Sequence, residues 1–144
     1  MQPDPTDWKI INILSQQYVP NSTIARQLGL SEGAIRQRIK KLQNAGILII
    51  KALRDPNVLE NQQLAIVGVN LSQTRLLDEK TREISQLQNV LSASIVSGRY
   101  DILVEVLVDS NKGLVRFLTE ILSCVEGIRQ TETFVILKSC HKWI

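Results

Sequence analysis

The sequence predicts an α+β fold, in which a helical N-terminal part precedes a domain that mixes strands with helices. Three patterns predict it. Apolar residues recur at helical spacing up to Leu42, and apolar side chains alternate between two faces from Ile102 to Val108. Helical spacing then returns, at positions i, i+3, i+4, i+7 and i+8, in Leu114, Phe117, Leu118, Ile121 and Leu122.

The first helix is predicted to begin at the sequence Asp4-Pro5. Aspartate is a favoured N-cap residue, proline fits the first helical position, and Asp7 lies in the first turn, where the helix dipole favours an acid. We interpret Trp8 as a packing residue beside a buried stripe made of Ile10, Ile13 and Leu14.

A tight turn separates a second helix from a third. The second has the apolar stripe Ile24, Ala25 and Leu28, and Gly29 ends it because glycine tolerates the left-handed conformation of a helix C-terminus. Ser31 is a good N-cap for the third helix. Its apolar residues are Ile35, Ile39 and Leu42. On a helical wheel these three fall within about 60° of one another. Roughly opposite lie Gly33, Arg36, Gln37, Lys40 and Asn44.

Positive charge is concentrated in this helical part. Residues 1–58 hold eight lysines and arginines against four acids, a net charge of +4, whereas the remainder has nine against ten, or −1. A local basic excess on a helix with a packed back is typical of a helix-turn-helix unit that binds double-stranded DNA. An ordinary helical hairpin with a solvated basic face is the alternative. The candidate DNA contacts are Arg26, Ser31, Glu32, Gly33, Arg36, Gln37, Arg38, Lys40 and Lys41.

The candidate contacts fall into two groups. Those at the start of the third helix, residues 31–37, are predicted to meet bases, with Arg36 suited to guanine and Gln37 to adenine. Phosphate contacts are predicted for Arg26, Lys40 and Lys41. Arg38 lies nearer the buried edge of the helix, where a phosphate contact and an internal ion pair are both open.

Composition narrows the class of protein. The chain has 144 residues, 44% hydrophobic and 22% charged, as expected for one medium globular domain or two small ones. No apolar run approaches the roughly 18 residues that span a membrane, and the N-terminus lacks the features of a secretory signal. Cys124 and Cys140 suit a reducing compartment. We expect a cytoplasmic protein without membrane association.

The pattern changes after the third helix. We predict a strand over Ile47–Ile50 and a linker over residues 52–62. The linker would separate a winged-helix-like head at 1–51 from a second domain at 63–144. The second domain is predicted to have strands at 64–71, 90–96, 102–108 and 128–137, and helices at 77–87 and 114–122. This βαββαβ order is the ferredoxin-like arrangement.

The strand from Ile102 to Val108 is apolar on both faces. One face carries Ile102, Val104, Val106 and Val108, and the other carries Leu103 and Leu107 with only Glu105 between them. Since the helices cover one face of such a sheet, the second would be a large exposed apolar patch. We expect a homodimer to bury it, sheet against sheet; the alternative is that the N-terminal head covers it.

A polar turn between two central strands is the candidate site for a small molecule. Its residues are Gly98, Arg99, Tyr100 and Asp101, and the last strand adds Thr131, Glu132 and Thr133. Amides near the glycine, the tyrosine hydroxyl and the aspartate together suit an ammonium and a carboxylate. An ordinary hairpin turn with polar residues is the alternative.

Several short motifs occur along the chain in a consistent order. They are Asp7 with Ile10, Ile13 and Leu14; Ile24-Ala25 through Leu28-Gly29-Leu30-Ser31; Ile35, Arg38-Ile39, Leu42 and Gly46-Ile47; Gly98 and Tyr100-Asp101; and Gly127-Ile128 with Thr131 and Thr133. In these motifs the chain resembles the leucine-responsive/asparagine-activator (Lrp/AsnC) transcription regulators over almost its whole length. The resemblance implies a DNA-binding head, a hinge strand and a βαββαβ module. It also implies dimers through the sheets, octamers of those dimers, and an amino-acid effector bound near the turn where dimers meet.

The turn departs from the family pattern. It usually reads Gly-Asp-Tyr-Asp in the family, whereas Arg99 replaces the first acid here. We hypothesise that this arginine weakens recognition of a plain α-ammonium, favours a ligand with an extra carboxylate, or abolishes effector binding.

Other functions find little support. A catalytic or zinc-binding role would fall to Cys124, Cys140 and His141, which lack a C-x-x-C spacing and a fourth ligand. We expect no enzyme, metal or cofactor, and His141 is interpreted as a surface or interface residue. RNA-recognition sheets stack bases on aromatic residues, but the central strands here are aliphatic. The remaining alternative is an amino-acid-sensing oligomeric module with weak or no specific DNA binding.

Overall fold

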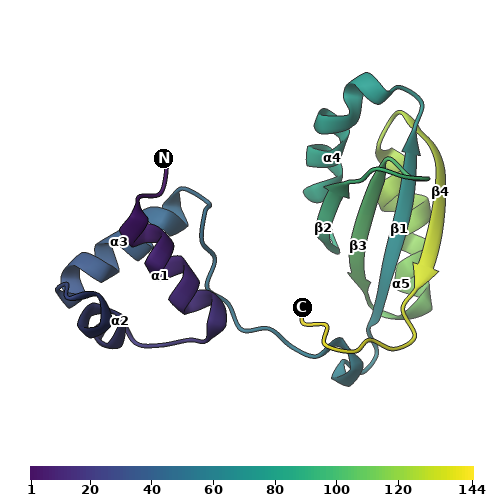
Figure 1. The fold of residues 1–144 in the computed structure, drawn as a ribbon. Coiled ribbons are helices and arrows are strands. Elements are labelled where there is room, and N and C mark those ends of the chain that lie inside the picture. The colour runs from purple at the N-terminus through teal and green to yellow at the C-terminus, as the bar shows by residue number, and fades with distance from the viewer. The chain divides into compact units, whose positions relative to one another are not determined.

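The computed structural model describes residues 1–144 as two compact units, Met1–Ala52 and Leu53–Ile144. The first is helical, and the second contains a four-stranded sheet with helices (Figure 1). The predicted α+β fold is confirmed. The expected linker residues from 53 onward belong to the second unit.

The first unit consists of helices α1 (Pro5–Gln16), α2 (Asn21–Leu28) and α3 (Glu32–Asn44). The predicted start of α1 is confirmed, since Asp4 and Asp7 form a capping box in which each carboxylate accepts the other's backbone N–H. Gly29 ends α2 with a φ of 67°, in the left-handed region. The Ser31 hydroxyl accepts the Ala34 N–H at 3.2 Å and caps α3 as predicted.

A small hydrophobic core joins the three helices. Its buried members are Ile10, Ile24, Ala25, Ile35 and Ile39, with Ile13, Leu14, Val19, Leu28 and Leu48 packed around them. The interpretation of Trp8 as a packing residue is wrong, because 52% of its surface is exposed.

The strand predicted over Ile47–Ile50 is also absent, and these residues form no regular structure. The chain supplies no strand to pair with them, and an isolated extended segment has no partner for its backbone groups. Leu48 instead packs on the helical core, while Ile49 is exposed.

The second unit has the predicted βαββαβ order. Its elements are β1 (Gln63–Leu71), α4 (Leu77–Ser85), β2 (Val90–Ile95), β3 (Ile102–Val108), α5 (Ser110–Arg116) and β4 (Ile128–Val135). Short 3-10 turns occupy Pro56–Val58 and Thr74–Leu76. The sheet order is β2-β3-β1-β4, with each neighbouring pair antiparallel, so that β1 and β3 are central.

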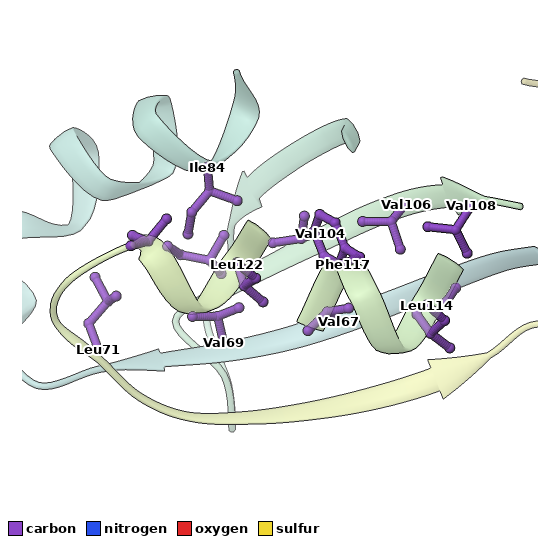
Figure 2. Packing of buried hydrophobic residues seen from close by; sticks show 13 residues of the cluster. Val67, Val69, Leu71, Ile84, Val104, Val106, Val108, Leu114, Phe117 and Leu122 are labelled. Carbon is purple, nitrogen blue, oxygen red and sulfur yellow. The ribbon is translucent and has the colours of Figure 1, made fainter. Parts of the chain in front are cut away.

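Both helices cover the same face of the sheet (Figure 2). Alternate residues of the central strands, including Val67, Val69 and Val104, pack there against Ile84 of α4 and Phe117 beyond α5. The alternation predicted for β3 is confirmed, because its even-numbered residues are buried and its odd-numbered ones are half-buried.

The last helix differs from the prediction in its geometry. The α-helix ends at Arg116, and the chain continues through a π-helical turn, Phe117–Ile121, and a 3-10 turn, Leu122–Cys124. This change keeps Phe117 and Leu122 buried in the core while altering the number of residues per turn.

Candidate functional site

Helix α3 has one buried side and one exposed side. Ile35, Ile39 and Leu42 are buried, whereas the residues predicted to meet DNA bases or phosphates lie on the exposed surface. These are Ser31, Glu32, Gly33, Arg36, Gln37, Lys40 and Lys41 on or beside α3, together with Arg26 on α2. Within the first unit, the sequence therefore presents a basic, water-accessible helix face of the kind that enters a major groove.

Arg36 is already paired within its own helix. Its Nη2 atom donates to Oε1 of Glu32 at 2.8 Å, one turn earlier, and both side chains are exposed. An exposed pair of this type contributes little stability, roughly 0.3–0.5 kcal/mol. Arg36 can therefore exchange this partner for a base at small cost.

Arg38 differs from the other candidates because it makes an internal ion pair. Its Nη1 atom donates at 2.7 Å both to Oδ2 of Asp4 and to Oδ1 of Asp7, and Asp7 is only 4% exposed. The two acids hold the pKa of Arg38 above its ordinary value. The Asp7 backbone N–H, followed by Arg38, holds the pKa of Asp4 below its ordinary value. Of the two roles left open for Arg38, the structure places it in the internal pair, which joins α1 to α3.

The sheet face opposite the helices carries the second set of apolar side chains. Cross-strand pairing places Ile66, Leu103 and Leu107 on this face, where they are half-buried, and adds Phe134, which is 44% exposed. We call these four residues the open face. Glu105 lies among them and is ion-paired with Lys142, so that its charge is neutralised within the chain.

The turn that precedes β3 is tied to the end of β1. The Asp101 N–H donates to the Val69 carbonyl at 3.0 Å and to Oδ1 of Asn70 at 3.1 Å. Asp101 Oδ2 accepts the Leu71 N–H at 2.8 Å, so part of the acceptor capacity of this carboxylate is already used within the chain. Asp101 therefore has a structural role in addition to the binding role predicted for it.

Tyr100 lies against the sheet on its open face. A Cβ atom added to Gly68 would lie 2.7 Å from two carbons of the Tyr100 ring, so only glycine leaves room for this ring. The ring also makes an edge-on contact with Phe134, with centroids 6.1 Å apart. Tyr100 is thus held between β1 and β4 rather than projecting freely from the turn.

The predicted β4 residues divide between the two faces of the sheet. Glu132 pairs with Gly68 and therefore shares the open face with Tyr100. Thr131 and Thr133 pair with Val69 and Val67, which face the helices, and Thr131 borders a cavity of about 300 Å³ beneath the last helix. Within one chain, the seven candidate effector residues do not line a single pocket. Gly98 and Arg99 are exposed at the turn.

Sequence reasoning missed three participants in this arrangement. Gly68, Asn70 and Phe134 hold the turn, yet each lies about thirty residues from it along the chain. Phe134 is the only aromatic residue within the strand Ile128–Val135, and this was the one sequence feature that could have pointed to its role. None of the helices is both long and apolar enough to cross a bilayer, and no cluster of three potential metal ligands occurs.

Comparison with known proteins identifies both units. The profile of the Lrp/AsnC ligand binding domain matches residues 64–142, and that of a winged helix-turn-helix DNA-binding domain matches residues 3–49. The chain is 35% identical to the HTH-type transcriptional regulator LysM of Saccharolobus solfataricus, over an alignment of 137 residues that covers 94% of each chain. The chain belongs to the Lrp/AsnC family of transcription regulators. It is therefore a DNA-binding regulator and not an enzyme.

Solved Lrp/AsnC structures share its fold. The leucine response regulatory protein of Mycobacterium tuberculosis superimposes with a TM-score of 0.79 at 22% identity, over 97% of this chain and 96% of that one. A regulator from Neisseria meningitidis, solved as a complex with L-Met, gives a TM-score of 0.69 at 22% identity over 98% and 94% of the two chains.

Proposed function

We propose that this Lrp/AsnC regulator binds a roughly palindromic DNA site as a homodimer, through the outward side of α3. The observation that carries the proposal is the division of α3 itself: its apolar side is buried, while Arg36, Gln37 and Lys40 are exposed. Two copies related by a two-fold axis would present two such helices to neighbouring major grooves.

The exposed residues are assigned different tasks. Arg36 and Gln37 would read guanine and adenine, with Ser31, Glu32 and Gly33 next to them at the start of the helix. Lys40, Lys41 and Arg26 would contact phosphates and fix the position of the head without selecting a sequence. Arg38 would position α3 through its internal ion pair.

Selection of bound fragments from genomic DNA tests the proposal and reveals the site. On the selected site, Arg36→Ala is expected to lose discrimination at one base pair, by about 1–3 kcal/mol. Lys40→Ala should weaken binding to all sequences and reduce the salt slope by about 1. Lys9→Ala, which removes an exposed lysine of α1, is the control and should change neither. Equal losses on specific and random DNA for both α3 variants would contradict the division of tasks. If the selection yields no specific site at all, the chain is instead a sensor without specific DNA binding.

We also propose that the C-terminal domain binds an amino acid near the Gly98–Asp101 turn. The family of this domain and the L-Met complex of the Neisseria regulator support an amino-acid ligand. The separation of Thr131 from Tyr100 across the sheet supports a site that a second copy helps to complete. Arg99, a free cation in an exposed turn, favours a ligand with a second carboxylate.

Calorimetric titration with glutamate, aspartate and leucine tests this preference. Tighter binding of the two acidic amino acids is expected, and Arg99→Asp, which restores the usual family residue, should remove their advantage. Leucine binding as tightly as glutamate to the unaltered chain would contradict an anionic ligand.

The open face is proposed as the dimer contact. It combines half-buried aliphatic residues with exposed Phe134 and a neutralised Glu105, which suits burial against an identical surface. Phe134→Asp should convert dimers, or octamers built from them, to monomers in light scattering. Val115→Asp is the control because Val115 is also an exposed apolar residue, but lies on α5. A monomeric unaltered chain would refute the contact. We place the regulator in the cytoplasm, where it would meet DNA.

A further inference from the structure

The last residues of the chain run beside the linker that leads to the sheet domain (Figure 1). Arg54 and Ile144 exchange two backbone hydrogen bonds, of 2.7 and 3.0 Å, in the manner of an antiparallel strand pair. Both segments belong to the second unit. We call residues 139–144 the tail.

Asn57 makes a second connection between the linker and the tail. Its side-chain amide donates to the Ser139 carbonyl at 2.8 Å, and its Oδ1 atom accepts the Ser139 N–H at 3.0 Å. The asparagine side chain thus pairs with both backbone groups of one tail residue. Asp55 holds Asn57 in place, since its Oδ1 accepts from the Asn57 backbone N–H and side-chain amide.

A third contact fixes the tail to the sheet. Lys142 forms an ion pair with Glu105, whose side chain is largely buried on β3. All the hydrogen bonds that join residues 53–62 to the rest of the domain end on the tail. The tail therefore supplies all the hydrogen bonds that hold the linker on the domain.

We propose that the tail sets the length of the free tether between the DNA-binding head and the sheet domain. Leu48 packs on the head core and Arg54 is paired with the tail, so residues 49–53 alone remain unattached. Five residues span at most about 17 Å. Without the tail, the free segment would extend to Gln62, before β1, and its fourteen residues would span up to about 48 Å.

A short tether restricts where the two heads of a dimer can reach on DNA. The tail and Asn57 thereby determine which spacings between half-sites are accepted, a second source of specificity beside the base contacts of α3. This step rests on the proposed dimer, whereas the attachment of the linker does not. The two are tested by separate measurements.

The attachment is tested on the full chain by hydrogen exchange and trypsin. Lys51 and Arg54 are adjacent tryptic sites, of which Lys51 lies in the free segment and Arg54 is paired with the tail. Slow cleavage after Arg54 relative to Lys51 is expected in the full chain. A chain that ends at Lys138, and Asn57→Ala in the full chain, should raise Arg54 cleavage and amide exchange by at least tenfold. Glu60→Ala, an exposed change in the same segment, is the control.

The spacing is tested on the selected DNA site with base pairs inserted between its halves. The full chain should bind over a narrow range of spacings, and both altered chains over a wider one, with unchanged affinity for a single half-site. If the Arg54 backbone amide exchanges equally fast in all chains, the attachment of the linker to the tail is refuted. A loosened linker with an unchanged spacing profile would refute its role in specificity. If the shortened chain does not fold, Asn57→Ala alone tests both the attachment of the linker and its role in specificity.

Discussion

Replacing Arg38 with alanine tests the difference between a positioning residue and a DNA contact. Arg38 makes two hydrogen bonds of 2.7 Å, to Asp4 and to Asp7. Asp7 is only 4% exposed. Without Arg38, its carboxylate would keep the hydrogen bond from the Asp4 N–H at 3.1 Å but would have no positive charge beside it. The uncompensated charge should destabilise the head while leaving the outward side of α3 unaltered.

The size of the effect follows from the burial of the pair. Removing one partner of a fully buried ion pair costs about 3–5 kcal/mol. The Arg38 side chain is 35% exposed, so water can partly replace it, and we expect a loss of about 2–3 kcal/mol. For a unit as small as residues 1–52, this corresponds to a fall in melting temperature of roughly 10–20 °C.

The fluorescence of Trp8 reports the unfolding of the head if Trp143 is replaced by phenylalanine in all chains compared. Arg36→Ala is the matched control, because its pair with Glu32 is exposed and its loss should cost less than about 0.5 kcal/mol. Below both melting temperatures, Arg38→Ala should keep the salt slope of DNA binding. Equal stability of the two variants, or a salt slope reduced by about 1 in Arg38→Ala, would refute the reasoning.

Two further predictions concern stability. Gly68→Ala should destabilise the sheet domain by about 1–3 kcal/mol, because the new methyl group would lie 2.7 Å from ring carbons of Tyr100; thermal unfolding of the second unit measures this, and Tyr100→Ala in the same chain should recover part of the loss. The pKa of Asp4 is lowered by the Asp7 N–H and by Arg38, so its stabilisation is present above its ordinary pKa of 3.8 and is lost as the pH falls through the lowered value. Melting of the head between pH 5 and pH 2 should therefore depend less on pH in Asp4→Asn, and identical profiles would contradict this.

The elements that the sequence predicted well are those with a local signal. Helical caps at Asp4 and Ser31 and the alternation of β3 depend on neighbours a few residues apart, and the structure reproduces them. The predicted ends of three of the strands differ from those in the structure by one or two residues, because the ends of such elements fray and have no sharp sequence signal. The strand at Ile47–Ile50 failed because a strand depends on a distant partner, which composition does not reveal.

The candidate site shows the same division. A helical wheel was enough to find the outward side of α3, because exposure follows from the position of the buried stripe. The partners of Arg38 lie 31 and 34 residues earlier, and the residues that hold Tyr100 are on other strands. Such contacts arise only from the tertiary fold. For the same reason the sequence did not reveal that the linker is fastened by the chain's own end.

The hydrophobic cores of the two units have no residue in common. A mutation that weakens the packing of one core therefore leaves the packing of the other core unchanged. Each unit can accumulate substitutions, or be replaced, independently of the other. A relative with a new head on the same sheet domain would keep the core of that domain while binding different DNA sites. Recombination between paralogues at residues 49–53 is the economical route to such a protein, because it cuts neither core.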